Sequence, residues 1–347
     1  MEGPVCPVPL QHEEKIVIGH GSGGRMTARL IANRFFPAFE NDALAQGDDA
    51  AVVGMAGEGR LAVSTDAHVV TPLFFPGGDI GSLAVCGTVN DLAMVGAQPR
   101  WLTASFILEE GLPIAQLEAI VESMRTSALE AGVSIIAGDT KVTEHGKVDG
   151  MFISTAGVGW VPAGRDIRGS GAQPGDVVLL SGTLGDHGIA VLAARGEMDF
   201  EVELESDIAP LNTMVEGMLL ASHSGVHVLR DPTRGGLATT LNEIAGQSGV
   251  TIRLNESAMP VRPAVNAACE MLGFDPLYVA NEGKLTAIVA PGDVDSILAA
   301  MRSSPYGVDA CVIGRVEEGH AQVIMDTAIG GTRIVDMLAG EMLPRIC

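Results

Sequence analysis

The sequence predicts a mixed α/β protein of the α+β class, built from two domains. Its 347 residues exceed the roughly 250 to 300 at which a single hydrophobic core stops growing. Hydrophobic residues make up 47% of the chain, aromatic residues only 4%, and there are 44 glycines. This composition is typical of soluble enzymes whose interiors are built from small aliphatic side chains joined by many tight loops.

The first half alternates short apolar runs with helical patterns. Strands are predicted at 15–18, 50–55, 60–65, 101–108 and 133–137. Helices are predicted at 25–36, 80–95 and 114–131. The last helix is the clearest, because apolar residues recur from Leu117 to Leu129 at the spacing of one helix face.

A stretch rich in Gly, Pro and Arg at 162–174 separates the two halves. After it, strands are predicted at 177–180, 250–254, 285–289 and 310–316, and helices at 186–195, 236–247, 262–272 and 294–301. We therefore divide the chain into a segment 1–43 with a glycine-rich loop, a first domain 44–162, a second domain 163–338 and a flexible tail 339–347.

Charge excludes some partners. With 21 basic and 43 acidic residues the formal net charge is −22, which argues against a broad nucleic-acid surface or an anionic-membrane surface, since both need clustered Lys and Arg. The chain starts without a basic leader, and no run approaches the roughly 18 apolar residues of a membrane span. We expect a cytoplasmic protein that binds neither nucleic acid nor membrane.

The five cysteines are far apart and include no C-x-x-C pair, so neither a disulfide framework nor a zinc site is indicated. Cys347 stands out by position, at the end of Pro344-Arg345-Ile346-Cys347. An extended tail from Gly340 reaches roughly 20 to 25 Å. That reach suits a carrier arm with a thiol at its tip, although a frayed terminus that happens to end in cysteine is the simpler alternative.

Acidic residues occupy positions where metal ligands are often found. Several follow predicted strands or lie in glycine-rich turns, namely Asp48, Asp49, Asp66, Asp139 and Asp231. Asp91 lies instead within a mostly apolar helix, where it is harder to explain as a surface residue. Gathered carboxylates repel one another unless cations neutralise them, and Mg²⁺ prefers carboxylate and phosphate oxygens. The pattern favours a magnesium–nucleotide site, while Asp as an ordinary turn or cap residue remains the alternative for each position.

The glycine loop matches G-x-G-x-x-G at Gly19, Gly21 and Gly24. Its amides, with those of Ser22 and Gly23, are placed to cover a phosphate at a helix N-terminus. The loop is not followed by the βαβ pattern of a dinucleotide fold, and the chain contains no Walker-type G-K-[ST]. We therefore interpret it as a phosphate-covering loop.

Three further side chains are candidates for chemistry. Lys141 lies two residues after Asp139 and suits charge stabilisation, whereas Glu282 suits proton transfer. His187, in Gly185-Asp186-His187-Gly188, is open between a functional role and that of a solvated or capping histidine. No His-x-x-x-His pair suggests zinc.

Ten segments together resemble the HypE family of hydrogenase maturation carbamoyl dehydratases, which belongs to the PurM-like (aminoimidazole ribonucleotide synthetase) superfamily. The resemblance runs nearly end to end, and the order of the segments plus the terminal cysteine makes it specific. The segments are His20-Gly21-Ser22-Gly23-Gly24, Ser64-Thr65-Asp66, Pro72-Leu73-Phe74-Phe75-Pro76-Gly77-Gly78, Asn90-Asp91, Phe106-Ile107-Leu108-Glu109-Glu110-Gly111, Gly138-Asp139-Thr140-Lys141-Val142, Ser181-Gly182-Thr183-Leu184-Gly185-Asp186-His187-Gly188, Asp231-Pro232-Thr233-Arg234-Gly235-Gly236, Ala280-Asn281-Glu282-Gly283-Lys284 and Pro344-Arg345-Ile346-Cys347.

The resemblance implies a PurM-like architecture, with an N-terminal sheet domain that dimerises and a C-terminal α/β sandwich. It also implies that a carbamoyltransferase, HypF, loads a carbamoyl group onto Cys347, which the protein then dehydrates with ATP to a thiocyanate. The cyanide would pass to iron on a HypC–HypD scaffold. A homodimer is expected, with nucleotide sites near the subunit junction.

The resemblance further assigns roles to residues. Magnesium is expected on Asp49, Asp66, Asp91 and Asp231, with Asp139. The same carboxylates, together with Thr140 and the loop residues Gly21, Ser22, Gly23 and Gly24, are expected to bind ATP. Lys141 would neutralise an oxyanion and Glu282 would act as the base.

Two rival functions remain at this stage. The first keeps the fold and changes the substrate, as in selenide, water dikinase or thiamine-monophosphate kinase, which are similar in the acidic positions. Neither gives a reason for the terminal cysteine, so loss of Cys347 would discriminate between them and the carrier hypothesis. The second is a non-catalytic docking module, which predicts binding without phosphate release.

Overall fold

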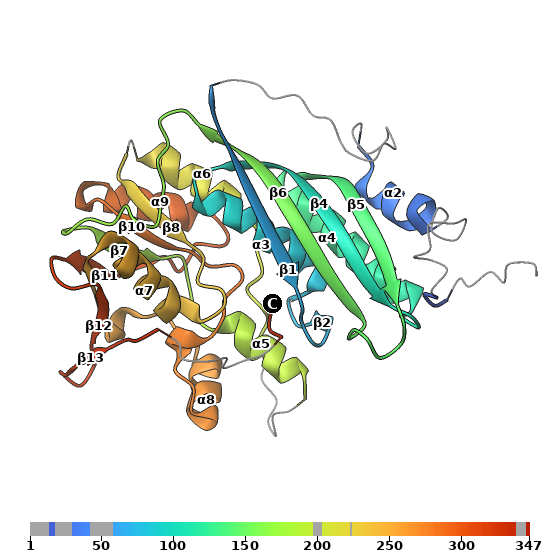
Figure 1. Cartoon of the computed structure of the whole chain (residues 1–347). Helices are drawn as coiled ribbons and strands as arrows, with labels where there is room; N and C mark the ends of the chain where they lie inside the picture. Colours follow the sequence, from blue (N-terminus) through green and yellow to red (C-terminus); the bar gives the residue numbers. More distant parts are fainter. Residues whose placement is uncertain (1–13, 18–29, 42–57, 197–202, 223, 338–344) are drawn as a thin grey trace, which may run out of the picture.

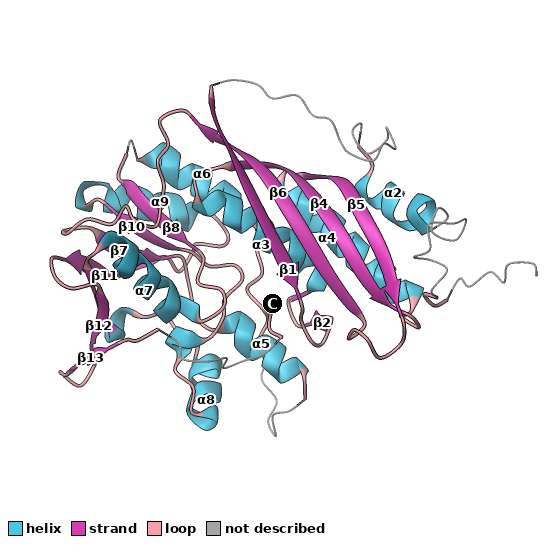
Figure 2. Cartoon of the chain, viewed as in Figure 1, coloured by secondary structure: helices cyan, strands magenta, loops and turns pink. Residues whose placement is uncertain are grey.

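The computed structural model describes residues 14–17, 30–41, 58–196, 203–222, 224–337 and 345–347, apart from the side chain of Ile31. Within these residues the chain forms two sheet domains that lie side by side (Figure 1). Figure 2 shows that helices lie against both sheets. No helix in the described part of the chain combines the length and apolar character needed to cross a membrane.

The N-terminal domain is a four-stranded sheet in the order β1-β6-β4-β5. Its strands are β1 (Gly59–His68), β4 (Gln98–Glu109), β5 (Ser134–Thr143) and β6 (Met151–Pro162). The β4–β5 pair is parallel, and the other two pairs are antiparallel. One face of the sheet packs on α3 (Ile80–Met94) and α4 (Ile114–Ala131), whereas no described helix covers the other face (Figure 1).

Smaller elements complete this domain. A π-helical turn, η2 (Ile31–Phe35), leads into α2 (Phe36–Phe39) beside β5. The hairpin of β2 (Phe74–Phe75) and β3 (Gly78–Asp79) precedes α3. Lys15, in the predicted first strand, makes only an isolated bridge to Pro113.

The C-terminal domain has a seven-stranded mixed sheet in the order β13-β12-β9-β11-β7-β10-β8. Its strands are β7 (Val177–Leu180), β8 (Val226–Arg230), β9 (Thr251–Asn255), β10 (Thr286–Val289), β11 (Cys311–Glu317), β12 (Gln322–Asp326) and β13 (Thr332–Ile334). Its helices are α5 (Asp186–Ala194), α6 (Asn212–Ala221), α7 (Gly236–Ser248), α8 (Pro263–Leu272) and α9 (Val294–Ser303), with 3₁₀ turns η4 (Glu256–Ala258), η5 (Pro276–Tyr278) and η6 (Pro291–Asp293).

Separate apolar clusters cover the two faces of this second sheet. Side chains of α7 pack with Val178 and Leu180 on one face, and side chains of α6 and α9 pack with Leu179 and Val289 on the other. This three-layer arrangement confirms the predicted α/β sandwich.

Helix α3 joins the two domains. It is buried on nearly every side, because it packs on the first sheet and also contacts α6 and β8 of the second domain. Arg165 also links the two domains, because it forms an ion pair with Glu216 of α6 at 2.6 Å and donates to the carbonyl of Gly96, just after α3, at 3.1 Å. The apolar helix predicted at 80–95 is therefore an interdomain core helix, which places its polar residues Asn90 and Asp91 at the junction.

The structure corrects several element predictions. Asp66 and Asp139 lie within β1 and β5, since both strands continue past the predicted ends at 65 and 137. The prediction that these two carboxylates follow strands is therefore wrong. The strand β6 was not predicted, nor were α6, β8, β12 and β13. The predicted strand at 50–55 lies outside the described residues, as does the helix predicted at 25–36 before residue 30.

Candidate functional site

The end of the chain lies at the junction of the two domains (Figure 1). Its last residues pair antiparallel with the segment after β1. The Val69 amide donates to the Cys347 carbonyl at 3.2 Å, and the Thr71 amide donates to the Arg345 carbonyl at 3.3 Å. Ile346 is 3% exposed and belongs to the core cluster of the N-terminal domain. These three residues are therefore docked in the protein.

Side chains from both domains hold the docked residues. The Arg195 guanidinium donates to the carbonyls of Thr71 at 2.8 Å and Arg345 at 2.6 Å. Arg345 donates in turn to Asp149 at 2.8 Å. His187 Nε2 lies 2.7 Å from the Ile346 carbonyl. The terminus is thus bound through its backbone by groups that approach from several directions.

The Cys347 thiol lies beside Glu282 in a largely enclosed position. Burial raises the pKa of the thiol well above its ordinary value, and the nearby negative charge of Glu282 adds to this. Arg234 acts in the opposite direction by favouring the thiolate. In this docked state the sulfur is a protonated, shielded thiol at neutral pH, and it lies close enough to the candidate base for the two groups to act on each other's charge.

Glu282 is fixed through its backbone. Its amide donates to Asp207 at 3.0 Å, and its carbonyl accepts from the Asn90 side chain at 3.2 Å. Asp207 is itself neutralised by Lys284, whose Nζ lies 3.0 Å away. The carboxyl of Glu282 is 5% exposed, and its Oε1 has no hydrogen-bond partner within the described residues. The rigid backbone therefore presents one open oxygen in the site.

The pKa of Glu282 is raised well above its usual range, first by burial and then by Asp231, Asp207 and Asp66. A raised pKa favours the protonated, neutral carboxyl, and positive charge nearby would lower the pKa again. A cation that offsets these neighbouring charges would therefore make Glu282 a more readily ionised base, which connects its reactivity to whatever binds the acidic residues.

Three of the predicted carboxylates face this junction. Asp66 comes from β1, Asp91 from α3, and Asp231 from the turn directly after β8. Ser64 donates to Asp91 at 2.6 Å, yet burial first, and then Asp66, raises the pKa of Asp91. Burial and the charge of Asp91 raise the pKa of Asp231 to about 7. The mutual repulsion identifies a place where positive charge would be stabilised.

These carboxylates do not form a closed metal cage. Within the residues that the structure describes, no three acidic, cysteine or histidine side chains converge closely enough to hold a metal ion. The residues fit Mg²⁺ that arrives with a nucleotide, because such ions usually keep several waters and take only one or two carboxylates plus phosphate oxygens. Asp49, predicted as a further ligand, lies outside the described residues, as do Gly21, Ser22, Gly23 and Gly24.

Two predicted site residues lie on the opposite face of the N-terminal sheet. Asp139 pairs with Ser105, and Lys141 pairs with Ile107, on the uncovered side of β5. They form an exposed pair, with Lys141 Nζ 3.5 Å from Asp139. β5 is also the far edge of the sheet from β1, which carries Asp66. Within one chain the sheet therefore separates Lys141 from Cys347.

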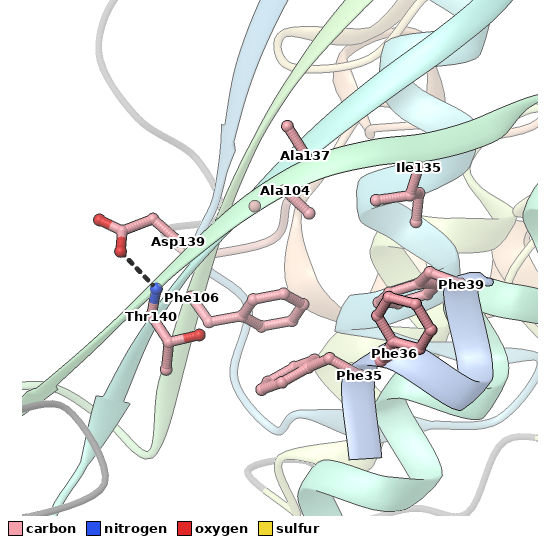
Figure 3. A pocket seen from close by; sticks show the side chains of 10 residues that line it. Phe35, Phe36, Phe39, Ala104, Phe106, Ile135, Ala137, Asp139 and Thr140 are labelled. Atoms are coloured by element: carbon pink, nitrogen blue, oxygen red, sulfur yellow. Dashed lines mark hydrogen bonds between the residues drawn. The ribbon is translucent and has the colours of Figure 1, made fainter. Parts of the chain in front are cut away.

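A pocket of about 140 Å³ opens beside Asp139 and Thr140. Its apolar wall consists of Phe35, Phe36 and Phe39 from the η2–α2 segment and of Phe106 from β4, whose ring centroid lies 4.8 Å from that of Phe35 (Figure 3). Figure 3 also shows the Asp139 carboxylate turned away from the rings, where it accepts a hydrogen bond from the Thr140 amide at 2.8 Å. The pocket thus combines an aromatic wall with polar groups at one rim.

Comparison with known proteins establishes the family. Models of the N-terminal and C-terminal domains of AIR synthase-related proteins match residues 47–161 and 173–326. A carbamoyl dehydratase HypE of Cupriavidus necator is 60% identical over 96% of this chain and 95% of its own length.

The chain belongs to the HypE family.

Solved HypE structures agree with this assignment. A HypE in complex with ATP is 49% identical, covers 95% of this chain and 99% of its own, and superposes with a TM-score of 0.91. A HypE–HypF complex is 48% identical, covers 89% of this chain and 99% of the other, and gives a TM-score of 0.78. The resemblance to the HypE family and the two-domain PurM-like fold predicted from the sequence are therefore confirmed.

Sequence reasoning overlooked or left open several residues of this HypE-family site. His187 was undecided, and the structure shows a buried side chain bonded to the tail. Arg234 lies in the same glycine-rich turn as Asp231 and was not singled out, although its charge acts on Cys347 and Glu282. Asn90 precedes Asp91, and its polarity in an apolar helix was an available signal. Asp207 offered no signal in the sequence, because its role depends on a contact with Glu282, which is distant from it in the chain.

Proposed function

We propose that this protein dehydrates a carbamoyl group carried on Cys347 to a thiocyanate, at the expense of ATP, and so supplies cyanide ligands for the iron of a [NiFe]-hydrogenase. The observation that carries the proposal is the position of the terminal thiol, which is docked beside a buried glutamate that faces three carboxylates. The names of its 47–60% identical relatives support the same activity.

The proposed chemistry removes one water from the S-carboxamide. The carbamoyl oxygen attacks the γ-phosphorus of ATP and releases ADP, which converts a poor leaving group into phosphate. Loss of the remaining nitrogen protons then expels the phosphate and leaves S–C≡N. The sum is S–C(O)NH₂ plus ATP giving S–C≡N, ADP, phosphate and one proton. Since Glu282 lies near the thiol, we assign it the removal of a nitrogen proton.

Burial of the docked terminus serves the same reaction. Water would hydrolyse both a thiocarbamate and its phosphorylated form, so the site must exclude it during the reaction. Ile346 packs into the core, and the paired backbone covers the approach to the sulfur from the side of Val69. The docked tail is therefore the state suited to dehydration, and an undocked tail is the state suited to loading by another enzyme.

ATP is the proposed phosphoryl donor, as the ATP complex of the 49% identical HypE suggests. Mg²⁺ bound with it would supply positive charge to the phosphates, next to one or two of Asp66, Asp91 and Asp231. That charge would also lower the pKa of Glu282 from its raised value. Nucleotide binding would thereby switch the glutamate to its basic form.

The aromatic pocket in Figure 3 lies beside β5, at the far edge of the sheet from Asp66, so it is our candidate for the adenine of a nucleotide whose phosphates reach the site of a neighbouring chain. A purine stacks on aromatic rings with a gain of roughly 1 to 3 kcal/mol per base, and polar groups at the rim suit the ribose and phosphates. Phe36→Ala should therefore raise the Kd for ATP by roughly 5- to 150-fold, as measured by titration calorimetry. An unchanged Kd would show that this pocket is not the adenine site.

We also propose a homodimer in which the uncovered faces of the N-terminal sheets meet. Leu61, Val63 and Ile107 on that face are exposed, and a second sheet would bury them. Because β5 and β1 are opposite edges of the sheet, we propose that the β5 edge with Lys141 and Asp139 lies next to the β1 edge of the neighbouring chain. There Lys141 would reach around that edge and neutralise the developing charge on the carbamoyl oxygen.

The proposed partners follow from the two states of the tail. A HypF carbamoyltransferase would load Cys347, as the HypE–HypF complex of a relative suggests. A HypC–HypD scaffold would accept the cyanide on iron. We propose that the protein works in the cytoplasm.

The decisive experiment measures the intact mass of the protein after incubation with HypF, carbamoyl phosphate and Mg-ATP, beside a Cys347→Ala variant. We expect an adduct on the wild type that loses the mass of one water only when ATP is present, and no adduct on the variant. With a HypF shown to be active, absence of an adduct on Cys347 would refute the carrier role. ATP consumption that survives loss of Cys347 would indicate a related kinase instead.

A further inference from the structure

His187 is a fully buried polar residue that the proposed chemistry does not use. It stands at the start of α5, with its ring edge-on to Phe75 at a centroid distance of 5.6 Å. Its Nε2 lies 2.7 Å from the Ile346 carbonyl and its Nδ1 lies 2.8 Å from Ser206 Oγ. Both ring nitrogens are therefore engaged, one of them by the tail.

The partners determine which nitrogen carries the proton. A carbonyl can only accept, so Nε2 must donate to Ile346. Burial lowers the pKa of His187, so the ring is neutral and Nδ1 accepts from the Ser206 hydroxyl. The Ser206 amide is held in turn by the Pro76 carbonyl at 2.8 Å. Ser206 thus orients the ring so that its N–H points at the tail.

The other side-chain contacts of the tail are more exposed. Arg345 and Asp149 are each about half exposed, and such surface pairs contribute little. The contacts of Arg195 to backbone carbonyls also lie nearer the surface. The His187 bond is buried at both ends, so leaving its N–H without a partner would be costly.

The same short segment also supports the candidate base. Ser206 orients His187, and the next residue, Asp207, binds the Glu282 amide at 3.0 Å and Lys284 at 3.0 Å. Two consecutive residues therefore fix both His187, which holds the tail, and Glu282, which lies near the sulfur.

We propose that His187 is the positioning residue for the carrier tail. Its Nε2–H bond to the Ile346 carbonyl stabilises the docked state and so sets the fraction of molecules whose tail is docked for dehydration and the fraction whose tail is free for loading. The inference rests on the proposed function only for what the docked state does. That His187 controls docking can be tested without any reaction.

The test compares two polar substitutions that differ in reach. Gln places its amide nitrogen about as far from the backbone as Nε2, whereas that of Asn is one bond shorter. His187→Gln therefore keeps a donor near Ile346, and His187→Asn removes it at a similar cost to packing. His227→Asn is the matched control, because His227 is a partly buried histidine bonded to Asp176 at 2.8 Å, away from the tail.

The measurement is the rate at which iodoacetamide alkylates Cys347, followed by intact mass in the full-length protein without HypF or ATP. A Cys347→Ala partner for each variant subtracts labelling of other cysteines. Loss of one buried hydrogen bond shifts such an equilibrium by roughly five- to hundredfold, so His187→Asn should accelerate alkylation by that factor. His187→Gln should restore a rate within about threefold of wild type, and His227→Asn should leave it unchanged.

Two outcomes would overturn the proposal. Either both His187 variants react at the wild-type rate, or both accelerate equally, which would indicate general loosening instead of a specific bond. Should His187→Asn not fold, Ser206→Ala tests the same point, because an unoriented ring should increase alkylation while the melting temperature stays close to wild type. An unchanged rate in folded Ser206→Ala would contradict the proposal.

A second readout uses HypF and Mg-ATP. His187→Asn should be carbamoylated at least as fast as wild type yet form thiocyanate several times more slowly, and His187→Gln should recover most of the dehydration rate. If wild-type protein forms no thiocyanate at all, the proposed function fails, while the alkylation result still decides the role of His187.

Discussion

The two faces of the N-terminal sheet differ in almost every respect. The inner face is covered by α3 and α4, carries Asp66 and adjoins the docked thiol. The outer face carries Lys141 and Asp139 and leaves Val63 72% exposed. Both faces hold residues predicted to act on one substrate, yet a sheet separates them. If the proposed roles of Lys141 and Asp139 hold, a single chain contains the parts of the site without assembling them, and the predictions below begin with this division.

The largest effect is expected on the inner face, for Glu282→Gln. The amide keeps the shape of the side chain but cannot accept a proton, so dehydration should fall by about 10²- to 10⁴-fold. Carbamoylation by HypF should persist, since we propose that loading uses the undocked tail. Intact mass would show a stable carbamoyl adduct. Glu109→Gln, which alters a carboxylate bound to the amides of Gly146 and Gly150 away from the site, is the control, and thiocyanate formation by Glu282→Gln at the wild-type rate would exclude the glutamate.

A mixing experiment tests whether the outer face serves a second chain. Lys141→Ala and Glu282→Gln should each be inactive alone. The two variants are mixed in equal amounts, unfolded, and refolded together, so that about half of the dimers contain one subunit of each variant. Each such dimer has one intact site, which gives about a quarter of wild-type activity. If Lys141 acted within its own chain, the mixture would remain inactive.

Disruption of the outer face should weaken self-association. Val63→Glu places two like charges across the proposed junction and should raise the dimer dissociation constant by about a hundredfold or more. Leu129→Glu is the matched control, because Leu129 is 66% exposed on α4, which covers the inner face. Sedimentation equilibrium would measure both. Equal behaviour of the two variants would indicate that the outer face is not the junction.

The smallest effect concerns the stability of the nucleotide-free protein. The folded pKa of Asp231, about 7, lies above its ordinary value of 3.8. Stability from this protonated carboxyl is full below pH 3.8 and is lost as the pH rises through 7. Asp231→Asn should remove that loss, with a free energy of unfolding on the order of 2 kcal/mol higher at pH 8 and no difference near pH 4. The free energy of unfolding is measured by urea denaturation of both proteins at each pH. If it changed with pH in the same way for both, this expectation would be contradicted.

Strongly patterned elements could be predicted from the sequence. Helix α4 spans the predicted residues, Ile114–Ala131, and β7 spans Val177–Leu180 as predicted. β6 was missed because its inward positions include glycine. A Cβ on Gly157 would lie 2.7 Å from the Thr88 side chain, so the close approach of α3 selects glycine and removes the apolar alternation that identifies a strand.

The site was predictable in its residue types but not in its geometry. Asp66, Asp91, Asp231 and Glu282 were recognised by position and motif, and the structure brings them together. The face on which Asp139 and Lys141 lie depends on how far β5 extends and on its register with β4. That information resides in pairing between distant strands, and local composition does not contain it.

The burial of Ile346 makes docking of the tail depend on temperature. Because docking transfers an isoleucine side chain from water into the core of the N-terminal domain, part of its free energy is hydrophobic and weakens on cooling. Cold should therefore shift the terminus outward. Under the proposed function, low temperature would then favour loading of the carbamoyl group over its dehydration. Carbamoylated protein would accumulate before it is converted to the thiocyanate.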